Sequence, residues 1–193
     1  MTELILALIG AALINNIVLQ HTLALDPLLR EGSATSRPWV HALGLATLLA
    51  MLLVCTLGQL LYLYILQPLH LDYLRLFVFL PLCVLTAAPL LAALQRWVKP
   101  WPFDGLKPLL TGNAALLGLC LLLSDEQRGV LPALAVGLGS GLGFWLVLAL
   151  FDDLRQRSLH DDVPPAFRGL PIELMGAGIM AMAFLGFSGL FTS

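Results

Sequence analysis

The sequence predicts an all-α polytopic membrane protein whose six transmembrane helices form two inverted three-helix repeats. Apolar residues make up 59% of the chain and charged residues 11%, whereas soluble globular proteins carry roughly 25% charged residues. The apolar residues gather in six stretches, most of them near the roughly 20 residues that a helix needs to cross a bilayer. These stretches occupy most of the chain, so we expect a single integral membrane domain over residues 1–193.

The basic residues are distributed unevenly around these stretches. Of the ten Lys and Arg residues, only Arg75 and Arg128 fall on one side of the predicted membrane. The other eight fall on the opposite side: Arg30, Arg37, Arg96, Lys99, Lys107, Arg155, Arg157 and Arg168. Because Lys and Arg are enriched in cytoplasmic loops, we expect both termini on the periplasmic side of a bacterial inner membrane. The net charge of −2, without a basic patch, gives no indication of nucleic-acid binding.

The first predicted helix, Leu4–Leu19, and the fourth, Leu109–Leu123, are the short ones. Each contains polar residues: Asn15 and Asn16 near the end of the first, and Thr111-Gly112-Asn113 near the start of the fourth. Short or interrupted helices at corresponding positions of two halves indicate a site near the membrane midplane. We therefore expect broken-helix ends around such a site, with the candidates Asn15, Asn16, Asp26, Gly112 and Asn113. Interhelical hydrogen bonds of about 0.6–2 kcal/mol each are an equal alternative for the asparagines.

The second and third predicted helices are longer. Trp39–Leu66 is long enough to cross the bilayer with a tilt. Leu74–Leu94 contains Pro81 and Pro89, which membrane helices tolerate where neighbouring groups satisfy the freed backbone carbonyls.

Glycines distinguish the last two predicted helices, Val130–Phe151 and Ile172–Phe191. In the fifth helix, alternate positions from Gly137 to Gly143 are glycine. Small residues let helix backbones approach closely in membranes, so we expect these glycines to serve packing. The repeats would then cover about residues 1–98 and 99–193, and three helices per repeat would invert the second repeat in the membrane.

Several motifs, in order along the whole chain, resemble those of a known family. The most specific lie near the C-terminus: Val163–Gly169, Ala177-Gly178, Met180, Ala183-Phe184 and Gly186–Leu190. Weaker ones are Asn15-Asn16, Val18-Leu19, Gly44–Thr47, Tyr73–Arg75, Asn113 and Leu117-Gly118. The chain resembles the A subunits of Rnf (Rsx) ion-translocating electron transport complexes (RnfA) and, more distantly, the D and E subunits of the sodium-pumping NADH:quinone reductase.

The resemblance implies a six-helix inner-membrane subunit that pairs with a homologous subunit of inverted topology (RnfE-like). It also implies that this pair holds a two-iron iron–sulfur cluster, with a cysteine from each short helix. Here the corresponding positions are Asp26 and Ala114. Iron–sulfur clusters need thiolate or occasionally imidazole ligands, so we expect this chain to bind no cluster itself. The family also tends to carry an acid late in the third helix, where this chain has Ala87-Ala88-Pro89.

Other polar residues have a structural interpretation beside a functional one. Asp26 is either a proton-accessible carboxylate or a solvated loop acid. Glu173 is either a functional intramembrane acid or an interfacial acid beside Arg168. The three cysteines stand singly in apolar stretches and are expected to be small buried or lipid-facing residues. We identify no catalytic residues.

Three functions remain open at this point. The first is a divergent membrane subunit of an Rnf-type complex, which couples electron transfer between ferredoxin and nicotinamide carriers to ion translocation. The second is a small-solute carrier with inverted repeats, although such a carrier should keep a charge near the midplane, which is almost uncharged here. The third is a scaffold subunit without a redox role.

Overall fold

A computed structural model describes residues 2–16, 19, 37–98, 101–103, 105–126, 129–158 and 164–188. Within these residues every regular element is helical. The elements are α1 (Thr2–Ile9), η1 (Gly10–Ile14), α3 (Arg37–Leu61), η2 (Tyr62–Leu66), η3 (Asp72–Leu74), α4 (Arg75–Trp97), α5 (Lys107–Thr111), α6 (Ala114–Asp125), α7 (Val130–Ser158), η4 (Pro165–Phe167) and α8 (Leu170–Ser188).

The helices confirm the predicted membrane fold class. Four of them are long and apolar enough to cross a bilayer: Pro38–Leu66, Asp72–Trp97, Lys107–Asp125 and Val130–Ser158. Two shorter apolar helices, Leu4–Ile14 and Leu170–Gly186, account for the remaining two predicted segments. The described part of the chain is therefore consistent with a six-helix membrane protein.

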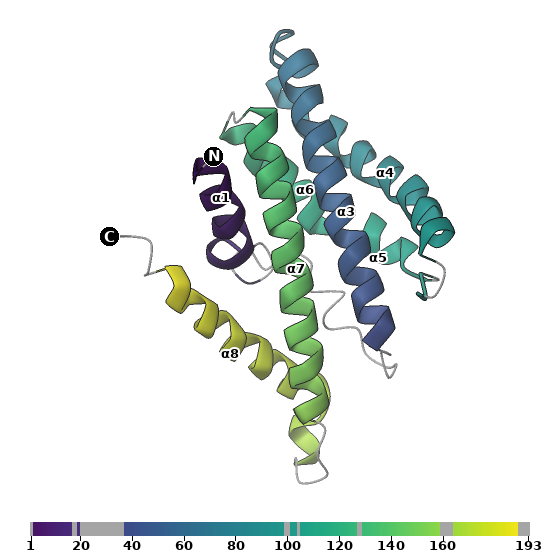
Figure 1. Ribbon diagram of the computed structural model, residues 1–193, viewed down its shortest axis with the longest axis vertical. Helices are drawn as coiled ribbons and strands as arrows, with labels where there is room; N and C mark the ends of the chain where they lie inside the picture. The colour runs from purple at the N-terminus through teal and green to yellow at the C-terminus, as the bar shows by residue number, and fades with distance from the viewer. Residues whose placement is uncertain are drawn as a thin grey trace.

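The centre of the molecule is an antiparallel pair of long helices, α3 and α7 (Figure 1). The α1–η1 segment packs against α7, while α4 and α6 pack against α3. The last helix, α8, starts beside the lower end of α7 and runs outward from it in Figure 1. The predicted division of the chain into two inverted repeats, and the boundaries of these repeats, stay a prediction.

Glycines on α7 explain how closely its neighbours approach. A Cβ added at Gly141 would lie 2.8 Å from the Leu48 Cα of α3, and one at Gly143 would lie 2.5 Å from the Ala12 carbonyl oxygen of η1. Gly137 faces α3 and Gly139 faces α1 in the same way. Gly137 and Gly141 thus let α3 approach α7 closely, and Gly139 and Gly143 do the same for α1 and η1. The predicted packing role of these glycines is confirmed.

The first, fourth and fifth predicted helices differ most from the structure. The first helix ends at Ile14 in a wide π-helical turn instead of at Leu19. The fifth continues to Ser158 instead of ending at Phe151. Hydrogen bonds from Gln156 to Asp152 and from Arg157 to Asp153, both 2.9 Å and four residues apart, extend it. Such pairs stabilise exposed helical turns, which is why a charged sequence that suggested a loop is helical.

The third difference is a break in the fourth helix, which separates α5 from α6 at Gly112-Asn113. Its residues are the polar ones that the sequence singled out as a broken-helix end.

Candidate functional site

The break between α5 and α6 is built by a glycine followed by a capping asparagine. The Gly112 N–H donates to the Pro108 carbonyl at 3.0 Å and closes α5. Asn113 then adopts an extended backbone, and its side-chain oxygen accepts from the Ala115 N–H at 3.0 Å. An asparagine in this position satisfies one of the free N–H groups that begin a helix. Since Asn113 is buried, this cap stabilises a helix start inside the protein.

The end of the first helix has a different construction. The Asn15 N–H donates to the Gly10 carbonyl at 2.7 Å, closing the wide turn η1. Asn15 is exposed, whereas Asn16 is buried and its Nδ2 donates to the Ala12 carbonyl at 3.0 Å. The absence of a side chain at Gly143 of α7 leaves room for this amide. Both predicted ends are therefore real helix ends with buried asparagines, but they pack mainly on different helices.

The family's cluster positions do not fit a cluster where the structure describes them. Ala114 is the first residue of α6, and its exposed methyl group offers no ligand atom. Asp26 lies outside the described residues. Among the described residues, no group of three or more His, Cys, Asp and Glu side chains suits a metal ion. That this chain supplies no cluster ligand stays a prediction, because it depends on Asp26 as well.

The cysteines lie closer together than their spacing in the sequence indicates. Cys55 of α3, Cys83 of α4 and Cys120 of α6 are all free and buried. The Cys120 thiol donates to the Val54 carbonyl at 3.4 Å and neighbours the thiols of Cys55 and Cys83. The expectation of small buried residues is confirmed. Their convergence was missed because it results from helix packing and leaves no local sequence signal.

The start of α4 holds a well-satisfied arginine. Arg75, at the start of α4, forms an ion pair with Asp125 at the end of α6. It also donates to the Ser124 hydroxyl at 3.2 Å and to the Asp72 carbonyl at 3.0 Å. The Asp125 side chain is 63% exposed, so this group is solvated and ties two helix ends together.

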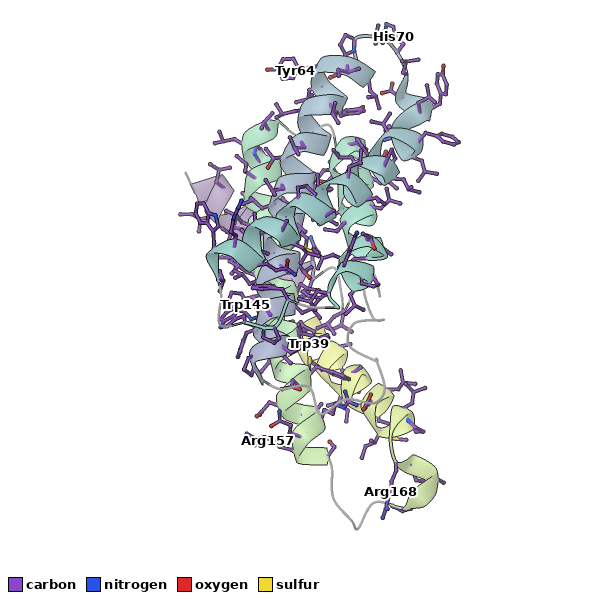
Figure 2. All side chains as sticks on the ribbon, turned by 90° about the vertical axis from the view of Figure 1, so that its right-hand side faces the viewer. Trp39, Tyr64, His70, Trp145, Arg157 and Arg168 are labelled. Atoms are coloured by element: carbon purple, nitrogen blue, oxygen red, sulfur yellow. The ribbon has the colours of Figure 1, made fainter. Side chains whose placement is uncertain are left out.

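A second ion pair lies at the opposite end, where Arg157 and Arg168 are found in Figure 2, far from Tyr64 and His70. Glu173 of α8 is buried, and its Oε1 accepts from the Arg155 Nε of α7 at 2.8 Å. Its other oxygen, Oε2, is buried without a hydrogen-bond partner among the described atoms. A small cavity lies beside it, lined by Phe151, Leu154, Arg155, Ser158, Ile172 and Glu173, among others.

Near this end a further cavity is lined by His41, Asp152, Asp153 and Gln156. The Nδ1 of His41 accepts from the Trp145 Nε1 at 3.1 Å, and the His41 ring lies between Trp101 and Trp145. His41 therefore packs against two tryptophan side chains. Gln156 and Arg157 already bond the two aspartates.

Comparison with known proteins identifies the family of this chain. Residues 4–191 match the family described as Rnf-Nqr subunit, membrane protein. The chain is 39% identical over 195 residues to the A subunit of the ion-translocating oxidoreductase complex of Syntrophotalea carbinolica, covering 98% of both chains. It is 40% identical to the corresponding A subunit of Pseudomonas aeruginosa, covering 98% of both, and 37% identical to that of Vibrio vulnificus, covering 98% of this chain and 99% of the relative. The chain therefore belongs to the Rnf-Nqr family of membrane subunits.

Proposed function

We propose that this chain is the A subunit of an Rnf-type complex that couples electron transfer, on the ferredoxin and nicotinamide side, to ion translocation across the bacterial inner membrane. The observation that carries this proposal is the match, over 98% of the chain, to relatives named as the A subunits of ion-translocating oxidoreductase complexes. The break at Gly112-Asn113 adds support, because a capped helix start inside the protein is typical of transport proteins.

Within this complex, the chain acts without cluster ligands of its own. Ala114 has no ligand atom, and an aspartate stands at position 26. Cys120 is a poor substitute, because its thiol is buried against α3 while Ala114 is exposed. The chain then contributes the helical framework of the translocation unit. The electrons pass through redox centres to which this chain supplies no ligand.

The partner is a homologous membrane subunit of inverted topology (RnfE-like). Two helices supply apolar surface for it and for lipid. In the apolar window of the span that contains α4, 22% is buried inside the protein, against 61% in the window of the span that contains α3. Large exposed apolar side chains also cover α8: Leu174, Met175, Ile179, Met182 and Leu185. In membranes such surfaces pack against lipid or other helices.

A solute carrier receives no support from the cavity beside Glu173. Its volume of about 20 Å³ is roughly the space for one water molecule, which is too small for an organic solute.

Inverted membrane vesicles test the proposed function. Vesicles from cells that lack this chain should show no ion uptake when supplied with reduced ferredoxin and NAD⁺, and the chain expressed in trans should restore it. Equal uptake with and without the chain would contradict the proposal.

The orientation is tested with tags at the two termini. The Lys and Arg distribution predicts that both tags react with a membrane-impermeant label only from the periplasmic side. Labelling of either tag from the cytoplasmic side would reject this topology.

Restoring thiols tests the loss of the cluster. If the backbone still follows the family, the double variant Asp26→Cys and Ala114→Cys, purified with its partner chains, should gain iron with the absorbance of a two-iron cluster. The matched control Asp26→Ser and Ala114→Ser should gain none. Equal iron in the wild-type complex, lost on replacing Asp26 with Ala, would instead show that the wild-type site already binds it.

A further inference from the structure

The carboxylate of Glu173 has one oxygen engaged and one free. Arg155 donates to Oε1 at 2.8 Å, while Oε2 is shielded from solvent and has no hydrogen-bond partner among the described atoms. The residue as a whole is 7% exposed. Buried polar atoms are nearly always paired, and charged ones are especially costly to leave unpaired. A free carboxylate oxygen in this position therefore indicates that something binds it.

The cavity beside Glu173 limits what that can be. Its volume is about 20 Å³, enough for roughly one water molecule. The apolar side chains of Phe151, Leu154 and Ile172 form most of its wall, and Ser158 adds a hydroxyl. This hydroxyl already donates to the Leu154 carbonyl at 2.9 Å. A water molecule or a single small cation fits this space, and a larger ligand does not.

The same surroundings favour a proton over a metal ion. Binding of a bare alkali cation requires several oxygens to replace its hydration shell. Among the side chains of the described wall, Glu173 offers one free carboxylate oxygen and Ser158 a hydroxyl. A proton needs only one acceptor and a water molecule to deliver it.

The charged groups around Glu173 place the cavity at the basic end of the molecule. Arg155 faces it from α7, and Arg168 lies in the exposed turn before α8. On α7, Asp152 bonds Gln156 and lines the separate cavity beside His41. The segment η1, which also touches α8, carries no titratable residue. Arg155 is thus the charge that Glu173 responds to most directly.

We propose that Glu173, with Arg155 and the adjoining cavity, is a proton-binding site at the cytoplasmic end of α7 and α8. A hydronium ion transfers its proton to Oε2, giving a neutral carboxylic acid and a water molecule. Oε1 keeps its hydrogen bond from Arg155, but the charge attraction between the helices is lost. The site itself stands on the structure; its part in proton uptake for translocation rests on the proposed function.

Infrared difference spectroscopy of the purified complex tests the binding step without electron transfer. Lowering the pH should produce a carboxylic-acid C=O band that is absent in Glu173→Gln and shifted in Glu173→Asp. The control Asp153→Asn removes an exposed acid from the same end of α7 and should leave the band unchanged. A band that persists in Glu173→Gln would overturn the site. Loss of the band on adding Na⁺ at constant pH would show that Na⁺ displaces the proton, and would overturn the preference of the site for a proton over a metal ion.

Ion uptake by inverted vesicles tests the role in translocation. Glu173→Gln should retain electron transfer from ferredoxin but lose proton uptake, and Glu173→Asp should recover part of it. Unchanged proton uptake in Glu173→Gln would overturn this role. Wild-type vesicles that take up no ion would refute the proposed function instead, while leaving the infrared result intact. Glutamine has nearly the volume of glutamate and can still accept from Arg155, and unchanged reactivity of the buried cysteines toward a thiol dye would show that the variant is folded.

Discussion

The two halves of α7 are built on different principles. Its first half is packed on two faces through glycines, with backbone groups of α1, η1 and α3 in direct contact. Its second half meets α8 through the ion pair of the partly exposed Arg155 with the buried Glu173, beside a cavity. Close packing leaves no space for a ligand and holds helices in one arrangement. The second half has both space and a charge. We therefore expect the first half of α7 to be rigid and the second half to bind a ligand such as a proton.

The largest effect is expected from Arg155→Leu, which breaks the α7–α8 pair. Removing one partner of a fully buried ion pair typically costs about 3–5 kcal/mol, because the other charge stays buried without compensation; since Arg155 is partly exposed, we expect a loss near the lower end of this range. Thermal unfolding in detergent can be followed with a thiol-reactive dye, since all three cysteines are free and buried. The double variant with Glu173→Gln should recover much of the loss. Wild-type stability in Arg155→Leu would contradict the described pairing.

A smaller loss is expected from Gly143→Ala in the packed half. The new methyl group would lie 2.5 Å from the Ala12 carbonyl oxygen and 2.8 Å from the Asn16 amide nitrogen. Overpacking of this kind costs about 1–3 kcal/mol, which the same dye assay measures.

The matched control for that variant is Gly178→Ala on α8, where nothing lies within 4 Å of an added Cβ. It should be neutral or stabilising by up to about 1 kcal/mol, because alanine favours the helix more than glycine does. Equal changes in stability at Gly143 and Gly178 would contradict the description of α7 as closely packed and of α8 as open at these positions.

The smallest effect is expected from Arg75→Gln at the start of α4. Its partner Asp125 is 63% exposed, and solvated ion pairs contribute about 0–1 kcal/mol. Arg157→Gln, which removes the exposed pair with Asp153, provides a comparison of the same class. If Arg75→Gln lost as much stability as Arg155→Leu, burial would not explain the difference between the two ion pairs.

Local features allowed much of the fold to be predicted from the sequence. Apolar length defined the helices, and the polar pair Gly112-Asn113 located the break because glycine and a capping asparagine act within one turn. The closely packed face of α7 also followed from its alternating glycines. The extension of α7 to Ser158 did not, because a run of charged residues is typical of a solvated loop, although the spacing of these charges supports a helix.

The site was harder to predict, because its parts come from different helices. Glu173 was recognised as a candidate, but its partner Arg155 and its free oxygen depend on how α8 meets α7. The neighbouring thiols of α3, α4 and α6 were missed for the same reason. Ala114 is the reverse case, since the missing ligand atom is evident from the sequence alone.

Purification of the natively expressed chain through an affinity tag decides whether it works within an ion-translocating complex. We predict that the other chains of an ion-translocating oxidoreductase complex co-purify, among them a homologous six-helix subunit with the opposite distribution of Lys and Arg. Recovery of the chain by itself, or only with further copies of itself, under conditions that keep membrane complexes intact would contradict membership of such a complex.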